Sequence, residues 1–305
     1  MSPVSRPYSH PADLNAMIDF LQSVRPPAWI SEYPGVVDLQ ESMGRPSIQE
    51  RTRLWIGENG DLVAFAFVLE PYNNLVFEIA LNAGRNVEDD LISWAFKSAD
   101  RSMGTLDTSC RDDDLARITL LERYSFIRMD DSTLHMVRDL KETLPLEKLP
   151  EGFTIRSIIG ESEVDAIVAL HQAAFGTSNM TREERLVIMH APDYDPSLDL
   201  IVIAPDGRMA GYCTCSISTV ENKLSGVKAG HTDPVAVHPD FQGRGLARAL
   251  LLTGARLLKE RGMDLARLGT SSDNFAMQKA AESAGFQVYS KRIWFSKVIP
   301  KNNDA

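Results

Sequence analysis

Val237-His-Pro-Asp-Phe-Gln-Gly-Arg-Gly-Leu-Ala247 is the most informative segment of this 305-residue sequence. The residues just before it, 232–237, are typical of a strand that ends at His238, and residues 246–261 are predicted to form a helix that Gly262 ends. Glycines directly before a helix let the backbone approach a ligand closely, and the first N–H groups of a helix have no partner within it. The helix dipole adds roughly half a positive charge at that end. The segment therefore predicts an anion site that suits a pyrophosphate.

Other phosphate-binding motifs fit this segment less well. No Gly-Lys-Ser or Gly-Lys-Thr follows the glycines, which excludes the P-loop pattern. A dinucleotide fingerprint needs three glycines and an acidic residue about 20 positions later, near the start of a sheet, and Gly243 and Gly245 supply only part of it. Taken alone, the glycine pair is also compatible with a plain tight turn.

The residues around the glycines resemble motif A of the GNAT superfamily of N-acetyltransferases. That motif reads Gln or Arg, two residues, Gly, one residue, and Gly or Ala, and Gln242, Gly245 and Ala247 occupy its three fixed positions. Downstream, residues 270–286 resemble motif B of the same superfamily, with Asn274 before a helix. Two motifs in the right order are more specific than either one alone.

This resemblance implies that acetyl-CoA is the cosubstrate and that no metal takes part. In the superfamily, the strand before motif A pairs with the pantetheine arm and the following loop holds the pyrophosphate. These contacts carry over onto Val235, Ala236, Val237, Gln242, Gly243, Arg244, Gly245, Leu246 and Ala247. Asn274 matches a position that bonds the pantetheine or acyl region. Lys279 is a further candidate phosphate contact, with an exposed helix lysine as the alternative.

The implied activity is direct transfer of an acetyl or other acyl group from a thioester to an amine of a small molecule or peptide. A general base must first take a proton from the ammonium group. Asp233 is the first candidate for base or amine contact, with a cap or turn as the structural alternative, and His231 is the second. Many members of the superfamily place a tyrosine acid where this chain has Ala281. Tyr289 is the candidate substitute, and a packed aromatic is the alternative.

A second unit with the same order of strands and helices precedes this one. The sequence therefore predicts an α/β fold of two tandem GNAT-like domains, each a central mixed β-sheet flanked by helices, over residues 1–145 and 152–305. At the place that corresponds to Gly243 and Gly245, the first domain has only Gly84, so we expect a degenerate domain without a phosphate site. Residues 176–196 and 219–230 are predicted to be loops that bind the acceptor.

Composition excludes several other classes. The formal net charge is -10, and residues 1–146 hold 14 basic and 23 acidic side chains, which argues against a nucleic-acid partner. The apolar runs are far shorter than the roughly 20 residues of a membrane span, and the start of the chain does not resemble an export signal. We expect a cytoplasmic monomer or homodimer without a membrane partner. Cys213 and Cys215 are interpreted as buried strand residues.

Two readings without catalysis remain open. A non-catalytic acyl-CoA sensor or regulatory protein is motivated by Ala281 and by the degenerate first half. A scaffold that keeps only the fold is the other. The intact loop argues against the scaffold, because a scaffold has no need for Gly243 and Gly245 together.

Overall fold

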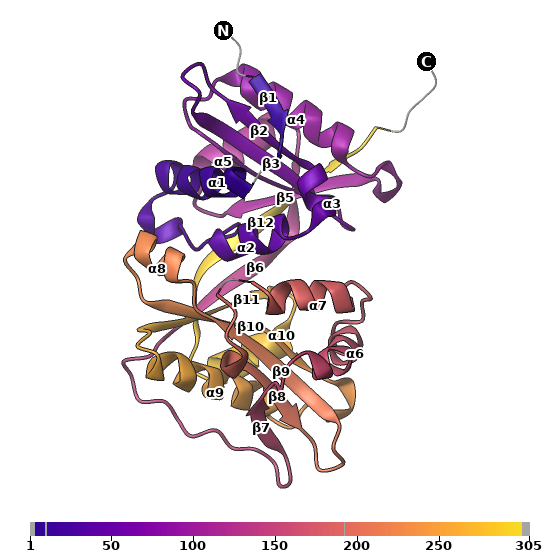
Figure 1. Ribbon diagram of the computed structural model, residues 1–305, viewed down its shortest axis with the longest axis vertical. Helices are drawn as coiled ribbons and strands as arrows, with labels where there is room; N and C mark the ends of the chain where they lie inside the picture. The colour runs from indigo at the N-terminus through magenta and orange to yellow at the C-terminus, as the bar shows by residue number, and fades with distance from the viewer. Residues whose placement is uncertain (1–3, 10, 192, 301–305) are drawn as a thin grey trace. The chain divides into compact units, whose positions relative to one another are not determined.

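The structure is a computed structural model that describes residues 4–9, 11–191 and 193–300. The chain forms two compact units (Figure 1). Unit 1 contains the described residues up to Ser132 and those from Arg292 on, and unit 2 is Thr133–Lys291. The chain passes between the units inside two long strands, β6 (Ile127–Asp139) and β12 (Gln287–Val298). This division differs from the predicted boundary at residues 145–152, because the second half of each long strand completes the sheet of the other unit.

Unit 1 is a mixed sheet in the order β1-β2-β3-β4-β5-β12. Its other strands are β1 (Val4–Pro7), β2 (Thr52–Ile56), β3 (Leu62–Leu69), β4 (Asn74–Ile79) and β5 (Thr105–Arg111). Only β4 and β5 pair in parallel, and the remaining neighbours are antiparallel. Helices cover both faces, which explains why β3 is a nearly continuous apolar run rather than an alternating one.

Two separate cores lie on the two faces of the unit 1 sheet. One lies under α1 (Pro11–Val24), α2 (Val36–Met43) and α3 (Pro46–Glu50), and includes Met17, Leu39 and Phe65. The other lies under α4 (Arg85–Ser98) and α5 (Leu115–Arg123). Short 3-10 helices at Pro27–Trp29 and Arg101–Met103 complete the unit.

Unit 2 repeats this arrangement in the order β6-β11-β10-β9-β8-β7. Its own strands are β7 (Thr154–Ser157), β8 (Asp199–Ile203), β9 (Met209–Ser216), β10 (Ala229–Val237) and β11 (Leu265–Ser271). The parallel pair is β10 with β11. One face packs against α6 (Val164–Phe175), and the other packs against α9 (Leu246–Glu260) and α10 (Phe275–Ser283). Short 3-10 helices lie at Glu161–Glu163, Pro196–Leu198 and Pro239–Phe241.

Helix α9 is the central helix of unit 2, and its apolar face lies directly on the sheet. Leu250, Leu251 and Ala255 are fully buried there, and each buried leucine contributes about 1.5–3 kcal/mol. Gly254 allows the close approach, since a Cβ at this position would lie 2.6 Å from the Sγ atom of Cys215. The segment 238–245, called the glycine loop below, is therefore attached to a firmly packed helix.

The predicted mixed α/β architecture is confirmed, but the two predicted acceptor loops are not simple loops. Residues 176–196 contain helix α7 (Arg182–Met189), and residues 219–230 contain helix α8 (Thr219–Ser225). Helix α7 begins with a capping box, in which Thr181 accepts from the Glu184 N–H and the Glu184 carboxylate accepts from the Thr181 N–H. The Thr-x-x-Glu spacing that signals this helix start is present in the sequence.

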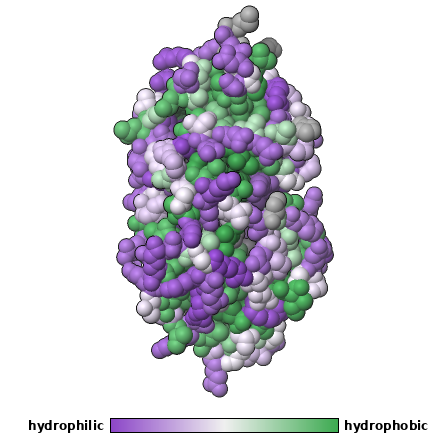
Figure 2. Space-filling model, turned by 60° about the vertical axis from the view of Figure 1, so that its left-hand side comes forward, coloured by the Kyte–Doolittle hydropathy of each residue, from purple (hydrophilic) through white to green (hydrophobic). Residues whose placement is uncertain are grey.

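Hydrophilic and hydrophobic side chains are interspersed on the face drawn in Figure 2. Among the residues described, no helix has the length and apolar character needed to cross a membrane. Cys213 and Cys215 are buried on the α9 side of β9, as predicted.

Candidate active site

Strands β10 and β11 separate part of the way along their length. Their parallel pairing ends at His231 and Arg267. Beyond this point β11 continues against β6, while residues 235–237 of β10 pair only with β9. Within the described chain, the other edge of β10 has no strand partner over Val235–Val237. Backbone polar groups at such an edge are free to pair with an extended ligand.

The open edge of β10 leads straight into the glycine loop, residues 238–245. Gly243 and Gly245 have φ values of 73° and 78°, which an L side chain rarely adopts. A Cβ at either position would meet no atom within 4 Å, so the loop backbone is uncovered. The first hydrogen bond of α9 runs from Ala249 N to the Gly245 carbonyl. The N–H groups before Ala249 therefore have no partner within the helix. These are the groups at which the sequence predicts an anion site.

The loop is held in place by contacts on its inner side. Phe241 is buried and packs edge-on against Phe153, with ring centroids 5.9 Å apart. Arg208 stacks over the Phe241 ring at 4.6 Å and binds Asp240 at 2.8 Å. The hydrogen bond from Arg208 lowers the pKa of Asp240. Gln242 Nε2 donates to the Val237 carbonyl at 3.2 Å, which fixes the start of the loop to the end of β10.

The residues predicted on the α10 side are placed as follows. The Oδ1 atom of Asn274 caps α10 by accepting from Met277 N at 3.1 Å, so this side chain has a structural role at the helix start. Lys279 is exposed on α10, and Arg244 is exposed in the glycine loop. Ala281 is fully buried in the core under α9. This position therefore points away from solvent and offers no proton donor.

His231 lies where the two strands separate, and a carboxylate faces each of its ring nitrogens. Its Nδ1 is 3.8 Å from Asp233 Oδ1, and its Nε2 is 3.9 Å from Glu221 Oε2. Asp233 Oδ2 also accepts from Gly269 N of β11 at 3.0 Å, so Asp233 bridges the separating strands. The two predicted candidates are thus neighbours. Glu221, on α8, was not expected from the sequence.

Tyr289 lies on β12 among side chains of β6 and β11. Its ring centroid is 6.2 Å from the His135 ring, and the Arg267 guanidinium carbon lies 5.7 Å from it. Arg267 is in turn the register partner of His231. Tyr289 is therefore linked to the strand split through Arg267.

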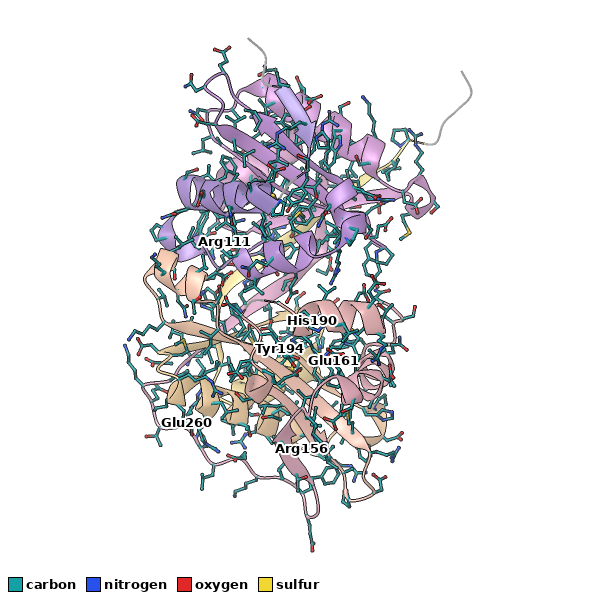
Figure 3. All side chains as sticks on the ribbon, in the orientation of Figure 1. Arg111, Arg156, Glu161, His190, Tyr194 and Glu260 are labelled. Carbon is teal, nitrogen blue, oxygen red and sulfur yellow. The ribbon has the colours of Figure 1, made fainter. Side chains whose placement is uncertain are left out.

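A buried polar network supports the same sheet under α7. Arg185 and Asp199 form an ion pair with almost no solvent exposure. Thr214 and Tyr194 donate to Asp199 at 3.1 Å and 2.6 Å. Burial, followed by the hydrogen bond to Asp199, raises the pKa of Tyr194, so this phenol stays protonated. Figure 3 labels Tyr194 in unit 2. The network fixes the loop before β8 to the sheet.

Comparisons with known proteins agree with this geometry. Residues 164–286, which include the strand split and the glycine loop, match the acetyltransferase (GNAT) family. The mycothiol acetyltransferase of Arthrobacter sp. (strain FB24) is 25% identical over 295 residues, covering 86% of this chain and 89% of the relative. The mycothiol acetyltransferase of Streptomyces coelicolor is 26% identical over 156 residues, which cover 50% of this chain and 48% of the relative.

Two solved structures share the fold over almost the whole chain. A GCN5-related N-acetyltransferase from Sphaerobacter thermophilus has a TM-score of 0.70 at 20% identity, and the match covers 100% of this chain and 98% of that one. A tandem GNAT protein from the clavulanic acid biosynthesis pathway has a TM-score of 0.72 at 14% identity, with 99% of both chains covered. Together with the family match over residues 164–286, these findings support a tandem GNAT N-acetyltransferase.

Proposed function

We propose that unit 2 binds acetyl-CoA and transfers its acetyl group directly to the amine of a small molecule. The pyrophosphate would lie on the first N–H groups of α9, and the pantetheine arm along Val235–Val237. The observation that carries this proposal is the continuity of the unpaired β10 edge with the glycine loop. One extended ligand with an anionic group can use both features at once.

In this proposal His231 is the general base and Asp233 contacts the ammonium group. Asp233 Oδ2 already accepts from Gly269 N, whereas Oδ1 faces His231 Nδ1. An ammonium group placed there can donate to Asp233 Oδ1 and give up one proton to His231 Nδ1. This order reverses the preference for Asp233 as base that the sequence suggested.

The chemical step then balances without a further reactant. The neutral amine attacks the thioester carbonyl carbon, the C–N bond forms, the C–S bond breaks, and the thiolate leaves with the bonding electrons. The nitrogen then gives its second proton to the thiolate, so the products are the amide and the free thiol. Backbone N–H groups at the β10 edge can stabilise the oxyanion. No acid is assigned, because Ala281 is a buried apolar residue and the ring of Tyr289 lies beside His135 and Arg267. A thiolate is a good enough leaving group to depart unprotonated.

A free-thiol assay with acetyl-CoA and a panel of amines tests this function. The acceptor of the mycothiol acetyltransferases comes first, since one of those relatives matches 86% of this chain, and peptide amines come second. Thiol release with one amine, together with the acetylated product by mass spectrometry, is the expected result. Acetyl-CoA binding without release for any amine would instead favour the acyl-CoA sensor, the alternative that the buried Ala281 supports.

A further inference from the structure

We propose that Glu221 is a positioning residue for His231. Its carboxylate holds the Nε2–H form of the imidazole and so leaves the lone pair on Nδ1, the nitrogen that faces Asp233. This inference rests on the proposed function of unit 2, because it names the group that prepares its base. Glu221 touches neither substrate in this proposal and acts only through the histidine ring.

The burial of Glu221 is the first support. In helix α8 it is the one buried residue, and its side chain is 6% exposed. A buried carboxylate costs several kcal/mol unless charged or hydrogen-bonding groups compensate it. A helix that serves only as a lid would turn an apolar side chain inward. Here the inward position is a carboxylate that lies next to an imidazole.

The attachment of α8 is the second support, because it fixes the carboxylate in place. The Ser218 hydroxyl caps the helix by accepting from the Glu221 N–H at 3.2 Å. Asn222 ties the helix to β10, since its Oδ1 accepts from Ala229 N at 3.0 Å. Backbone at both ends of the segment 218–229 is thus bonded, and the Glu221 side chain projects from a held helix.

The environment of the His231 ring is the third support. Glu221 faces Nε2 and the more exposed Asp233 faces Nδ1, at 3.9 Å and 3.8 Å. On the neighbouring strands, the register partners of His231 are Arg267 on β11 and Ser216 on β9. When one nitrogen of a neutral imidazole donates to a carboxylate, the other carries the lone pair. Both separations are ion-pair distances, so burial decides the choice: we assign the N–H to Nε2 beside the buried Glu221 and leave Nδ1 at the strand split to take the substrate proton.

The test combines ring-nitrogen NMR with kinetics on the full-length protein. In the wild type we expect His231 protonated on Nε2 and not on Nδ1 at neutral pH. In Glu221→Gln we expect a mixture of tautomers and a fall of about tenfold in kcat. The KM for acetyl-CoA and the KM for the amine that serves as acetyl acceptor should stay unchanged. Glu221→Asp keeps the charge on a shorter side chain, and its kcat should lie between the two.

A double-mutant comparison separates positioning from a structural role. If Glu221 acts through the imidazole, Glu221→Gln causes no further loss in a His231→Ala background. An equal loss in both backgrounds would overturn the inference, and so would an unchanged tautomer. Glu147→Gln is the matched control: this carboxylate pairs with Arg256 on the other face of the sheet, and its loss should leave kcat unchanged.

The outcomes also separate this inference from the proposed function. If the wild-type protein releases thiol with no amine, the proposed function fails, while the ring-nitrogen spectra still test whether Glu221 sets the tautomer. If the wild-type protein is active and the spectra of Glu221→Gln match the wild type, only the inference fails. Should Glu221→Gln melt below the assay temperature, Glu221→Asp provides the same spectra and rates.

Discussion

The two units contain the same strand split but use it in opposite ways. In unit 2, β10 and β11 part after His231, and the freed edge of β10 leads to two exposed glycines. In unit 1, β4 and β5 pair only at Asn74–Asp107 and Leu75–Thr108 before they part. There a guanidinium occupies the freed edge. The fold thus provides the opening, and the side chains around it decide whether a ligand can enter.

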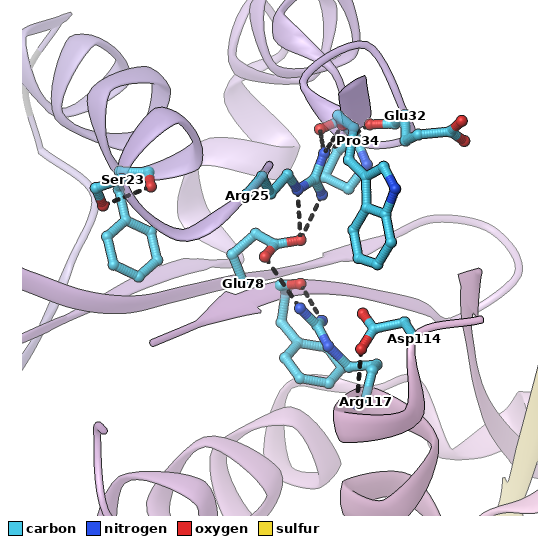
Figure 4. A network of polar contacts seen from close by, with 10 residues as sticks. Ser23, Arg25, Glu32, Pro34, Glu78, Asp114 and Arg117 are labelled. Carbon is cyan, nitrogen blue, oxygen red and sulfur yellow. Dashed lines mark hydrogen bonds and ion pairs between the residues drawn. The ribbon is translucent and has the colours of Figure 1, made fainter. Parts of the chain in front are cut away.

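Arg117 is the residue that occupies the edge in unit 1. It donates to the Phe77 carbonyl at 2.6 Å and to Glu78 Oε2 at 3.0 Å (Figure 4). Arg25 binds the other oxygen of the same carboxylate. Burial raises the pKa of Glu78, but the two guanidinium groups lower it by more than burial raises it. The net shift of the pKa is therefore downward, and the carboxylate stays charged. An ion network lies where β10 of unit 2 has no strand partner among the described residues.

The connection after the split differs as well. In unit 1 residues 80–84 join β4 to α4, whereas in unit 2 the longer segment 238–245 joins β10 to α9. Gly84 is the glycine before α4 and has a φ of 85°, close to that of Gly245. A single glycine in a short connection provides a helix start but no cradle for two phosphates. That the first domain has no phosphate site stays a prediction from the sequence.

The largest effect should come from Gly245→Glu. The new carboxylate would face the pyrophosphate, and like charges in contact cost several kcal/mol, so acetyl-CoA affinity should fall by at least about 100-fold. Gly84→Glu in unit 1 is the matched control, since it places the same side chain before a helix at a similar φ, and it should not change affinity. Calorimetry measures both, and equal affinities for Gly245→Glu and wild type would refute the site.

Glu78→Gln should destabilise the protein by about 3–5 kcal/mol, because it leaves two buried guanidinium groups without their shared carboxylate. Since the pKa of Glu78 is lowered in the folded state, its stabilising effect is present above its ordinary value of 4.5 and is lost as pH falls below it. Urea denaturation at neutral and acid pH measures this, and the variant should lose less stability on acidification than the wild type. An equal loss of unfolding free energy on acidification in the variant and the wild type would contradict the role of the network.

His231→Ala should lower kcat by about 100-fold, the range expected for loss of a general base. Acetyl-CoA affinity should stay at the wild-type value, because His231 lies outside the glycine loop. His135→Ala, which removes a histidine from β6 in the same unit, should have a much smaller effect. Steady-state rates with the acceptor amine provide the comparison. Equal losses of kcat in both variants would show that His231 is not the general base.

Asp233→Asn should have a smaller effect, about tenfold, mainly on the KM for the amine. The amide still accepts from Gly269 N and so keeps the strand bridge, but it no longer attracts the ammonium group. The measurement is the rate as a function of amine concentration. A fall in kcat as large as that of His231→Ala, with the amine KM unchanged, would restore Asp233 as the base.

The smallest effect should come from Arg117→Met. This change empties the β4 edge but provides no glycine loop, so we expect no second acetyl-CoA site. The number of molecules bound per chain in calorimetry should stay the same as in the wild type. A gain of binding in this variant would show that the side chain alone blocks unit 1, and the connection 80–84 would lose its part in the comparison.

Sequence reasoning predicted most of the fold and the position of the glycine loop before α9, because both depend on local signals. Strand alternation, the Gln242–Ala247 motif and Gly262 after a helix are all written in short windows of sequence. The unit boundary was not visible, since it depends on which strand the ends of β6 and β12 join, a choice made by long-range pairing. Local patterns carry no information on such partners.

The residues around His231 could be predicted only in part, for the same reason. Asp233 and His231 lie close together in sequence next to a recognisable motif, so they could be selected. Glu221 belongs to a short helix between β9 and β10, and its start is signalled by Ser218 three residues earlier. Nothing in the sequence says that this glutamate, and not its apolar neighbour Val220, is the buried one. That fact depends on how α8 lies on the sheet.

Calorimetric titration of the full-length protein with acetyl-CoA tests the contrast between the units most directly. An open edge with a glycine loop in unit 2 and a filled edge in unit 1 predict one molecule bound per chain, with all binding lost in Gly245→Glu and none lost in Gly84→Glu. Two molecules bound per chain, or binding that survives Gly245→Glu, would contradict the assignment of the coenzyme site to unit 2 alone.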